Sequence, residues 1–145
     1  MRVFTKADLL QGMVDHPYDT NPELRANVNF FFFSKDRKLA VAYYESPTGW
    51  FDVVVDGFEE IDYVLEGEVV LESQENRLVA KAGDCFLIQD GDRFRWRMTQ
   101  PSRMIFFIYP VTRAIDGLIA SFYRNGNSIP SKNKGQTDDG ESGSA

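Results

Sequence analysis

The sequence predicts an all-β domain, either a sandwich or a closed barrel, on the strength of two observations. Between residues 29 and 109, short runs of β-branched and aromatic residues follow one another. Most of these runs end at a turn signal such as Asp56-Gly57, Glu66-Gly67 or Asp90-Gly91. Strands that recur at this spacing, with turns between them, are typical of small β-sandwiches and barrels. The length of 145 residues suits one domain that builds its own core.

The turn signals define the expected elements in order. Strands are predicted at residues 29–33, 39–45, 50–55, 61–65, 68–72, 77–80, 85–88, 94–98 and 104–109. Before them, Thr5 and Asp8 frame a short N-terminal helix, and the Asp-, Asn- and Pro-rich residues 15–27 are expected to form a loop. After them, residues 112–123 carry apolar residues at helical spacing and predict one short helix. Residues 128–145 are polar and are expected to be a disordered tail, so the domain spans residues 1–127.

Composition excludes several classes of function. The formal net charge of −6 argues against a nucleic-acid partner, which a basic surface would attract. A single cysteine, Cys85, excludes an internal disulfide, and a single histidine, His16, excludes sites that need two imidazoles. The apolar runs are far shorter than the ~20 residues of a membrane helix, and no signal peptide is recognisable. We therefore expect a cytoplasmic protein that does not associate with membranes.

Two glycine-bounded segments resemble the signature motifs of the cupin superfamily. Glu60 and Gly67 match the glutamate and glycine that close the first motif, and Gly83 and Gly91 match glycines of the second. The string Tyr63-Val-Leu-Glu-Gly67, together with Ala82-Gly-Asp84 and Trp96, is similar to the branch that holds the ethanolamine-utilisation cupins. The resemblance implies a jelly-roll β-barrel. It says little about the chemistry, because one fold hosts many functions.

The departures from the family pattern concern the metal site. Cupins usually hold a metal with three histidines and a glutamate, and the matching positions here are Val54, Asp56, Glu60 and Phe94. Two of the four have no donor atom, so we expect neither a transition metal nor another cofactor. The alternative is a hard ion held by carboxylates and water. His16 is expected to be exposed; it can reach the site only if the N-terminal segment folds over the barrel.

Glu60 and Asp62 are the leading candidates for chemistry. They lie two apart on an expected strand, so they share one face, about 6.6 Å apart at Cα. Alternation alone would turn Ile61, Tyr63 and Leu65 inward and leave the acids in solvent. The resemblance instead implies that Glu60 points into the barrel, and Asp62 follows it. Two carboxyls confined in an apolar interior have raised pKa values and can share one proton, as general acid/base catalysis requires.

Further residues complete the expected site. Asp56 is a third candidate acid, and its alternative role is to begin an Asp-Gly turn. Phe94 stands at a metal-ligand position and shares its face with Trp96, so both should line a cavity for a flat or apolar molecule. The alternative is that these rings only fill the barrel. The other candidate lining residues are Val54, Tyr43 and Tyr109.

The remaining reactive side chains are assigned structural roles. Arg93, Arg95 and Arg97 alternate with the aromatic residues of their strand, so we expect them to face outward and pair with surface acids. The minority alternative is an anion clamp at the rim. Cys85 has no base or helix N-terminus near it in the sequence and is expected to be a buried, inert thiol.

These expectations lead to three functional hypotheses. The first is a metal-independent cupin that binds a small apolar or aromatic molecule and catalyses a lyase, dehydratase, isomerase or cyclase reaction with its carboxylates. The second is a non-catalytic cupin, for example an accessory of an ethanolamine-utilisation system. The third is a metal enzyme with an atypical carboxylate site. The four rings of residues 30–33 put two on each face of a strand, so a C-terminal helix or a second subunit should cover them, and we expect a homodimer.

Overall fold

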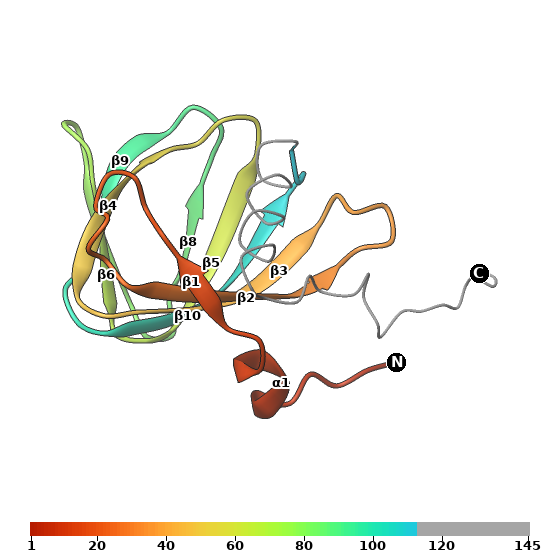
Figure 1. Cartoon of the computed structure of the whole chain (residues 1–145). Coiled ribbons are helices and arrows are strands. Elements are labelled where there is room, and N and C mark those ends of the chain that lie inside the picture. Colours follow the sequence, from red (N-terminus) through yellow and green to blue (C-terminus); the bar gives the residue numbers. More distant parts are fainter. Residues whose placement is uncertain (113–145) are drawn as a thin grey trace.

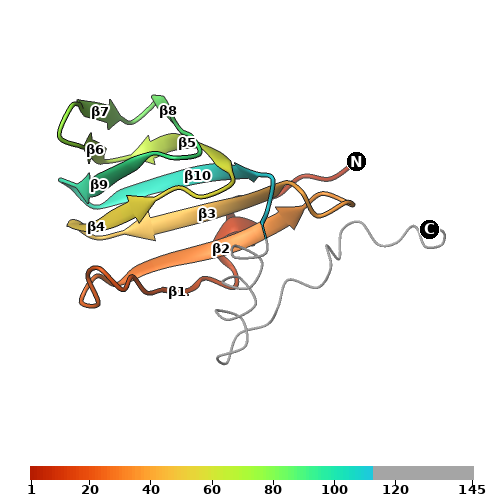
Figure 2. The same ribbon diagram turned by 90° about the horizontal axis from the view of Figure 1, so that it is seen from above.

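Two antiparallel sheets face each other and enclose the core (Figures 1 and 2). The structure, a computed structural model, describes residues 1–112. The larger sheet has the strand order β1 (Val14–His16), β2 (Ala26–Phe33), β3 (Ala40–Ser46), β10 (Ser102–Tyr109), β5 (Glu59–Glu66) and β8 (Cys85–Ile88). The smaller sheet has the order β4 (Gly49–Val54), β9 (Arg93–Met98), β6 (Glu68–Glu72) and β7 (Arg77–Lys81).

The nine predicted strands are confirmed within one to three residues at their ends, and the all-β jelly-roll class is confirmed with them. The N-terminal helix is confirmed as α1 (Lys6–Leu10), and a capping box caps its N-terminus. In that box Asp8 N–H donates to Thr5 Oγ1 at 3.2 Å, and Thr5 N–H donates to Asp8 Oδ2 at 2.8 Å. The helix expected over residues 112–123 lies outside the described residues except for its first residue, and the boundary at 127 and the polar tail lie wholly outside them.

One strand was not predicted. Residues 14–16 form β1, which pairs with β2 in the register Val14↔Val28 and His16↔Ala26. The loop that follows β1 reaches the smaller sheet, where Asn21 Nδ2 donates to the carbonyl of Trp50 at 2.9 Å. The amide of Asp52 donates to Thr20 Oγ1 at 3.0 Å. Because β1 and β4 are edge strands of the two sheets, this loop closes one side of the barrel.

The aromatic run of β2 is divided between two faces by a bulge. The register shifts between Phe30 and Phe32, so Phe31 is an extra residue, and Phe30 and Phe33 both reach the core. Phe31 and Phe32 turn outward, where the ring of Phe4 lies 5.0 and 6.3 Å from theirs. The N-terminal segment therefore contacts this face, a contribution that the sequence did not suggest.

The arginines of β9 follow the sequence prediction. Arg95 binds Asp52 through two hydrogen bonds of 2.7 and 3.1 Å and lies over the ring of Trp50. Arg97 pairs with Glu72 at 2.9 Å, and Arg93 is exposed. The residues of β9 that alternate with these arginines, including Trp96, therefore face the interior.

Strand β5 reverses the usual alternation of a half-buried strand. Its apolar residues Ile61, Tyr63 and Leu65 are 45, 40 and 39 % exposed. Asp62 is 1 % exposed, and Glu60 shares its side of the sheet. The orientation implied by the family resemblance is therefore the one observed, and the orientation implied by alternation alone is wrong. Acids at core positions demand a functional explanation, because burying a carboxyl costs free energy.

None of the helices among the described residues is long and apolar enough to cross a membrane.

Candidate active site

The carboxyl pair lies on β5, between β10 and the edge strand β8 of the larger sheet. Glu60 pairs with Ile108 of β10 and Ile88 of β8, and Asp62 pairs with Phe106 and Phe86 on the same two strands. The two carboxyls lie within hydrogen-bonding reach of each other, so one can donate to the other when it is protonated. One oxygen of Asp62, Oδ1, is buried and has no hydrogen-bond partner among residues 1–112. A buried carboxyl oxygen without a partner marks a place where a ligand can donate a hydrogen bond.

Burial is the main cause of the unusual acid strength of the pair. It raises the pKa of Glu60 to about 7, and the hydrogen bond from Asp62 opposes this rise. Burial raises the pKa of Asp62 well above its ordinary value, and the neighbouring charge of Glu60 raises it further. Asp62 therefore holds the shared proton and donates it to the Glu60 carboxylate. The pair offers an acid and a base side by side near neutral pH.

Two tyrosine hydroxyls lie within electrostatic range of the carboxyls. Tyr18 Oη and Tyr44 Oη are 2.9 Å apart and share a hydrogen bond. Burial raises the pKa of both phenols, and the charges of Glu60 and Asp62 contribute to the rise. Both hydroxyls therefore remain protonated and can serve as hydrogen-bond donors.

Sequence reasoning missed the segment that brings Tyr18 to this place. His16 of β1 was expected to be exposed, and this prediction is wrong because pairing with β2 turns the imidazole inward. Its ring stacks on Tyr18 at 4.4 Å, and burial lowers the pKa of His16 to about 4. The signal was the alternation of Val14, His16 and Tyr18 with polar residues or proline, which is too short to distinguish from a loop.

A row of stacked rings continues from Tyr18 across the interior. Tyr18 stacks on Phe51 at 3.8 Å, and Phe51 stacks on Trp96 at 5.1 Å. Phe94 and Phe86 contact Trp96 at centroid distances of 6.5 and 5.1 Å. The predicted placement of Phe94 and Trp96 in the interior is confirmed. Trp96 is 5 % exposed, and its Nε1 donates no hydrogen bond within residues 1–112.

Two candidate residues from the first motif lie outside the barrel. Val54 is 57 % exposed, and Asp56 is exposed in the turn after β4. The inward parity of β4 instead carries Phe51 and Val53, followed by the buried Val55. The spacing to Glu60 had assigned Val54 and Asp56 to metal-ligand positions, but both residues lie on the outward-facing side of the chain. Asp56 fits its alternative role of beginning the Asp-Gly turn.

Tyr43 and Tyr109 are also corrected, since both lie on the outer face of the larger sheet. Tyr43 is buried at 3 %, but its hydroxyl donates to Glu45 at 3.0 Å and accepts from Arg103 at 3.2 Å on that face. Tyr109 is 54 % exposed. Adjacent tyrosines 43 and 44 point to opposite faces, and Tyr44 is the one that reaches the interior.

The residues at the family's metal positions do not fit a metal. Of the four, only Glu60 has a donor atom that faces the interior, since Val54 and Asp56 point outward and Phe94 has no donor. Within the described part of the chain, no three His, Cys, Asp or Glu side chains gather closely enough to hold an ion. No step of the chemistry is therefore assigned to a metal.

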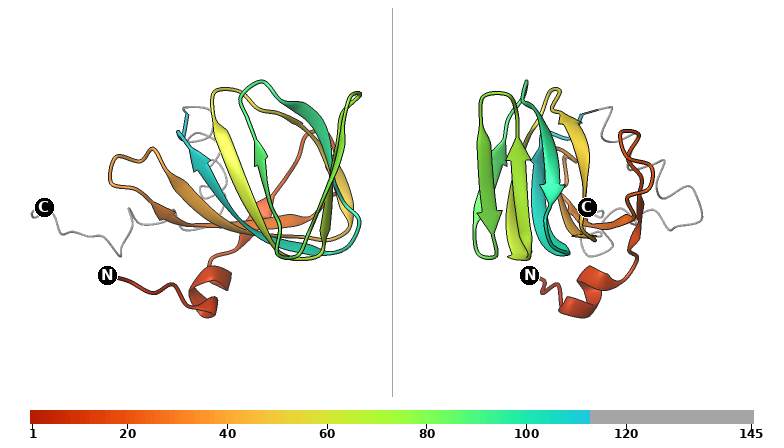
Figure 3. Two further views of the ribbon diagram at one scale, coloured as in Figure 1. Left: turned by 180° about the vertical axis from the view of Figure 1, so that it is seen from behind. Right: turned by 90° about the vertical axis from the view of Figure 1, so that its left-hand side faces the viewer.

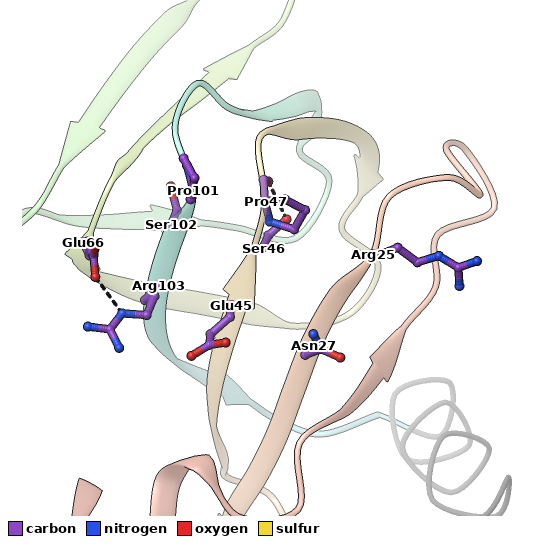
Figure 4. A pocket seen from close by; sticks show the side chains of 9 residues that line it. All are labelled: Arg25, Asn27, Glu45, Ser46, Pro47, Glu66, Pro101, Ser102 and Arg103. Carbon is purple, nitrogen blue, oxygen red and sulfur yellow. Dashed lines mark hydrogen bonds and ion pairs between the residues drawn. The ribbon is translucent and has the colours of Figure 1, made fainter.

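A surface hollow of about 310 Å³ lies away from the acid pair, where β3 ends and β10 begins (Figure 4). It is lined by Arg25, Asn27, Glu45, Ser46, Pro47, Glu66, Pro101, Ser102 and Arg103. Arg103 pairs with Glu66 at 2.8 Å and also binds Tyr43. Along β5, Glu66 is six residues from Glu60, or roughly 20 Å. The hollow is therefore separate from the carboxyl pair.

The two-sheet jelly roll and the motif glycines define the class of protein as the cupin superfamily. Within that class, the chain belongs to the family of the ethanolamine utilisation protein EutQ, whose family model matches residues 14–114. No curated protein matches the chain.

Solved structures share the fold at low sequence identity. The EutQ protein of Clostridium difficile is 24 % identical over 65 % of this chain and 75 % of that one, with a TM-score of 0.57. A putative ethanolamine utilization protein Q from Salmonella typhimurium is 21 % identical over 68 % of this chain and 80 % of that one, with a TM-score of 0.60. The ectoine synthase of P. lautus is 16 % identical over 76 % and 78 %, with a TM-score of 0.61. At these identities the likeness concerns the fold alone.

Proposed function

We propose that this cupin catalyses acid/base chemistry on a small, apolar or aromatic molecule, with Glu60 and Asp62 as the catalytic pair. The observation that carries the proposal is the inverted strand β5, which turns two acids inward, Asp62 buried and Glu60 half-buried, within reach of a shared proton. A structural role gives no reason to turn both acids inward while exposing Ile61, Tyr63 and Leu65. Strongly perturbed carboxyls in an enclosed site are typical of catalytic groups.

The proton balance of such a reaction follows from the pair. Glu60, as carboxylate, removes a proton from a carbon next to a carbonyl group of the substrate. Asp62 donates its proton to the leaving hydroxyl, which departs as water in a dehydration, or to the carbonyl oxygen in an enolisation. Transfer of the proton from Glu60 to Asp62 through their hydrogen bond restores the starting state after a dehydration. Lyase, isomerase and cyclase reactions can all use this arrangement.

Recognition of the substrate rests on the rings and on two unpartnered polar atoms. Phe51, Phe94 and Trp96 offer flat surfaces on which a planar molecule can stack. Trp96 Nε1 can donate to an acceptor of the substrate, and Asp62 Oδ1 can accept from a donor. Tyr18 stacks on Phe51 where such a molecule would lie, so substrate entry requires the loop after β1 to move.

A non-catalytic, ligand-binding or accessory cupin is the second candidate. The observation that favours it is the position of Tyr18. Its ring stacks on Phe51 in the interior, and its hydroxyl is hydrogen-bonded to that of Tyr44. A loop that two hydrogen bonds anchor to β4 leaves little room for a substrate. In this role the carboxyl pair would form hydrogen bonds with a bound ligand without converting it to a product.

A screen for ligands followed by a turnover assay tests the proposal. Small aromatic and aliphatic hydroxy acids and ketones are screened for compounds that raise the Tm of the protein. Each compound that binds is then incubated with the protein, and its conversion to product is followed by NMR. Glu60→Gln and Asp62→Asn should each reduce turnover by roughly 10²- to 10⁴-fold. Glu59→Gln is the matched control, because this acid is exposed on the same strand and should leave turnover unchanged.

The two candidates give different outcomes in this assay. Turnover that survives both substitutions would contradict the catalytic assignment. Binding without conversion, with affinity that depends on Asp62, would favour the non-catalytic cupin.

A further inference from the structure

Within residues 1–112, the interior of the barrel holds two acids but no lysine or arginine. Glu60 and Asp62 face inward from β5, whereas every Lys and Arg of this part of the chain lies on the outer surface. Acids on the outside have basic partners, as Asp52 has in Arg95. Because charges inside a protein are normally paired, an ionised carboxyl pair here needs a positive charge from a bound molecule.

The other ionisable groups that face the carboxyl pair carry no positive charge. Tyr18, in the loop after β1, and Tyr44 of β3 have raised pKa values, so both phenols stay protonated and neutral. Burial lowers the pKa of His16 on β1 to about 4, so its imidazole is neutral at pH 7 as well. The other strands of the described chain turn no ionisable side chain toward the interior.

Cys85 lies on the opposite side of the sheet from the carboxyl pair. The prediction that this thiol is buried is wrong: Cys85 is exposed on β8, because it shares the outward parity of Leu87 and pairs with the outward-facing Tyr63. Negative charge on this thiol would raise the pKa of Asp62 further. It therefore offers the pair no compensating positive charge.

Two buried polar atoms near the pair have no partner within residues 1–112. Asp62 Oδ1 is an acceptor and Trp96 Nε1 is a donor, and their residues are 1 and 5 % exposed. Both residues adjoin Phe86, since Asp62 pairs with it across the strands and the ring of Trp96 lies 5.1 Å from its ring. A ligand that satisfies both atoms must carry a hydrogen-bond donor and an acceptor.

The barrel is open to solvent on the side of these two atoms. Leu78 of β7 pairs with Leu71 and therefore faces the interior, yet it is 57 % exposed. Phe86 is half-buried on β8. These two strands are edges of different sheets, and no strand of the described residues joins them (Figures 2 and 3). This side gives a polar head group an approach to Asp62, in addition to the side closed by the loop after β1.

We propose that the interior binds a small organic ammonium ion with an apolar or aromatic body. An N–H group of the ligand donates to Asp62 Oδ1, and the Glu60 carboxylate balances its charge. Trp96 Nε1 donates to a carbonyl oxygen of the same ligand. Aromatic walls attract a cation, whereas two carboxyls repel a carboxylate. The inference rests on the proposed function and names its substrate class: amines that carry a carbonyl group, in preference to hydroxy acids.

Matched probes that differ in charge test this ligand class. Benzylammonium, benzyl alcohol and benzoate form an aromatic set, and butylammonium, 1-butanol and butanoate form an aliphatic one. Their binding to the full-length protein is measured by isothermal titration calorimetry at about pH 8 and constant ionic strength, with potassium ion as the inorganic comparison. In at least one set the ammonium should bind roughly 10-fold or more tightly than the alcohol and the carboxylate, since hydrogen bonds to charged groups are the stronger ones. Potassium ion should not compete with it.

Proton release provides a readout on the unmodified protein. The pKa of Glu60 is about 7, so at about pH 6 most of the carboxyl pair is uncharged before the ligand arrives. Binding of the ammonium should then expel nearly one proton to solvent, which titrations in buffers of different ionisation enthalpy measure. The affinity should rise most steeply below pH 7, by up to about 10-fold per pH unit. The alcohol should release no proton.

Variants assign the effect to the pair. Glu60→Gln removes the charge and keeps the shape, so it should weaken binding of the ammonium by roughly 10- to 100-fold and abolish the proton release, with little change for the alcohol. Glu59→Gln is the matched control, because this acid is exposed on the same strand and should leave both affinities unchanged. If Glu60→Gln fails to fold, the proton release of the unmodified protein still decides.

Several outcomes would overturn the proposal. They are equal affinity for ammonium and alcohol, tighter binding of the carboxylate, competition by potassium ion, and no binding of either set at millimolar concentrations. Binding of the ammonium without proton release at about pH 6 would overturn it too. None of these readouts uses turnover. A neutral ketone that the carboxyl pair converts would sustain the proposed function while this inference fails, and an ammonium ion that binds through Glu60 without conversion would do the reverse.

Discussion

Unfolding free energies measured in denaturant across a pH series should fall as the pH rises above about 6.5. Glu60 has a pKa of about 7 in the folded protein against 4.5 as its ordinary value. Between these values the folded state keeps a proton that the unfolded chain has lost, so the stability present below about pH 4.5 is lost as the pH rises through 7. Asp62, whose pKa is raised well above its ordinary value of 3.8, adds a second loss that begins near that value and continues to higher pH. Each proton changes the slope by about 1.4 kcal/mol per pH unit.

His16 opposes this trend at lower pH. Its pKa is about 4 in the folded protein against 6.5 ordinarily. The stability from its neutral ring is therefore complete above about pH 6.5 and is lost as the pH falls through 4. Between about pH 4.5 and 6.5 the slope of His16 is opposite in sign to the slopes of Glu60 and Asp62, so it offsets about one of the two acids. The decline should therefore be shallower in that window and steepen above pH 6.5, where the contribution of His16 is complete.

Variants separate the two contributions. Asp62→Asn should remove most of the decline above pH 7, because the amide keeps the shape and donates to an ionised Glu60. His16→Gln should make the decline steeper between about pH 4.5 and 6.5, because nothing then offsets the second acid. Glu59→Gln, the exposed neighbour, should follow the wild type. A wild-type stability that is flat or rises between about pH 6.5 and 9 would contradict the buried pair.

Gly67→Ala should be the most destabilising small substitution in the turns, at about 3 kcal/mol or more. Gly67 joins β5 to β6 with φ of +95°, which disfavours any side chain. An added Cβ would lie 2.5 Å from the carbonyl oxygen of Pro101 and 2.8 Å from Ser102 Cα, and it would also meet Ser102 Oγ. Because two of these atoms belong to the backbone, relief requires β10 to shift away from its neighbours.

Gly83→Ala is the matched control for this contact. Gly83 has the same φ of +95°, but nothing lies within 4 Å of an added Cβ. It should therefore cost only the backbone strain, about 1 to 2 kcal/mol. Denaturant unfolding of both variants measures the difference. Equal costs would mean that the close approach of Pro101 and Ser102 is not what selects glycine at position 67.

Local patterns predicted the strands of this fold but not the direction of every side chain. Turn dipeptides such as Asp56-Gly57 located the strand ends, because a positive φ at glycine is a local requirement. The direction of Glu60 came from a resemblance, since alternation alone points its apolar neighbours inward. Tyr43 and Tyr44 could not be assigned to a face, because either parity buries a ring.

The interior was less predictable where it depends on distant contacts. Tyr18 reaches the carboxyl pair only because the three-residue strand β1 pairs with β2 and the following loop bonds to β4. The bulge at Phe31 moves Phe33 into the core against strict alternation. Pairing and bulges depend on tertiary contacts that no short window of sequence contains.

The central claim is that Glu60 and Asp62 share a proton inside the barrel, and titration of the individual carboxyl carbons by NMR tests it most directly. The two resonances are assigned by comparison with Glu60→Gln and Asp62→Asn. We expect Glu60 to titrate near pH 7 and Asp62 above its ordinary range, each transition changing when the other acid is replaced. If both carboxyls titrate independently near their ordinary values, ~4.3 and ~3.9, the pair is not buried together and the account is wrong.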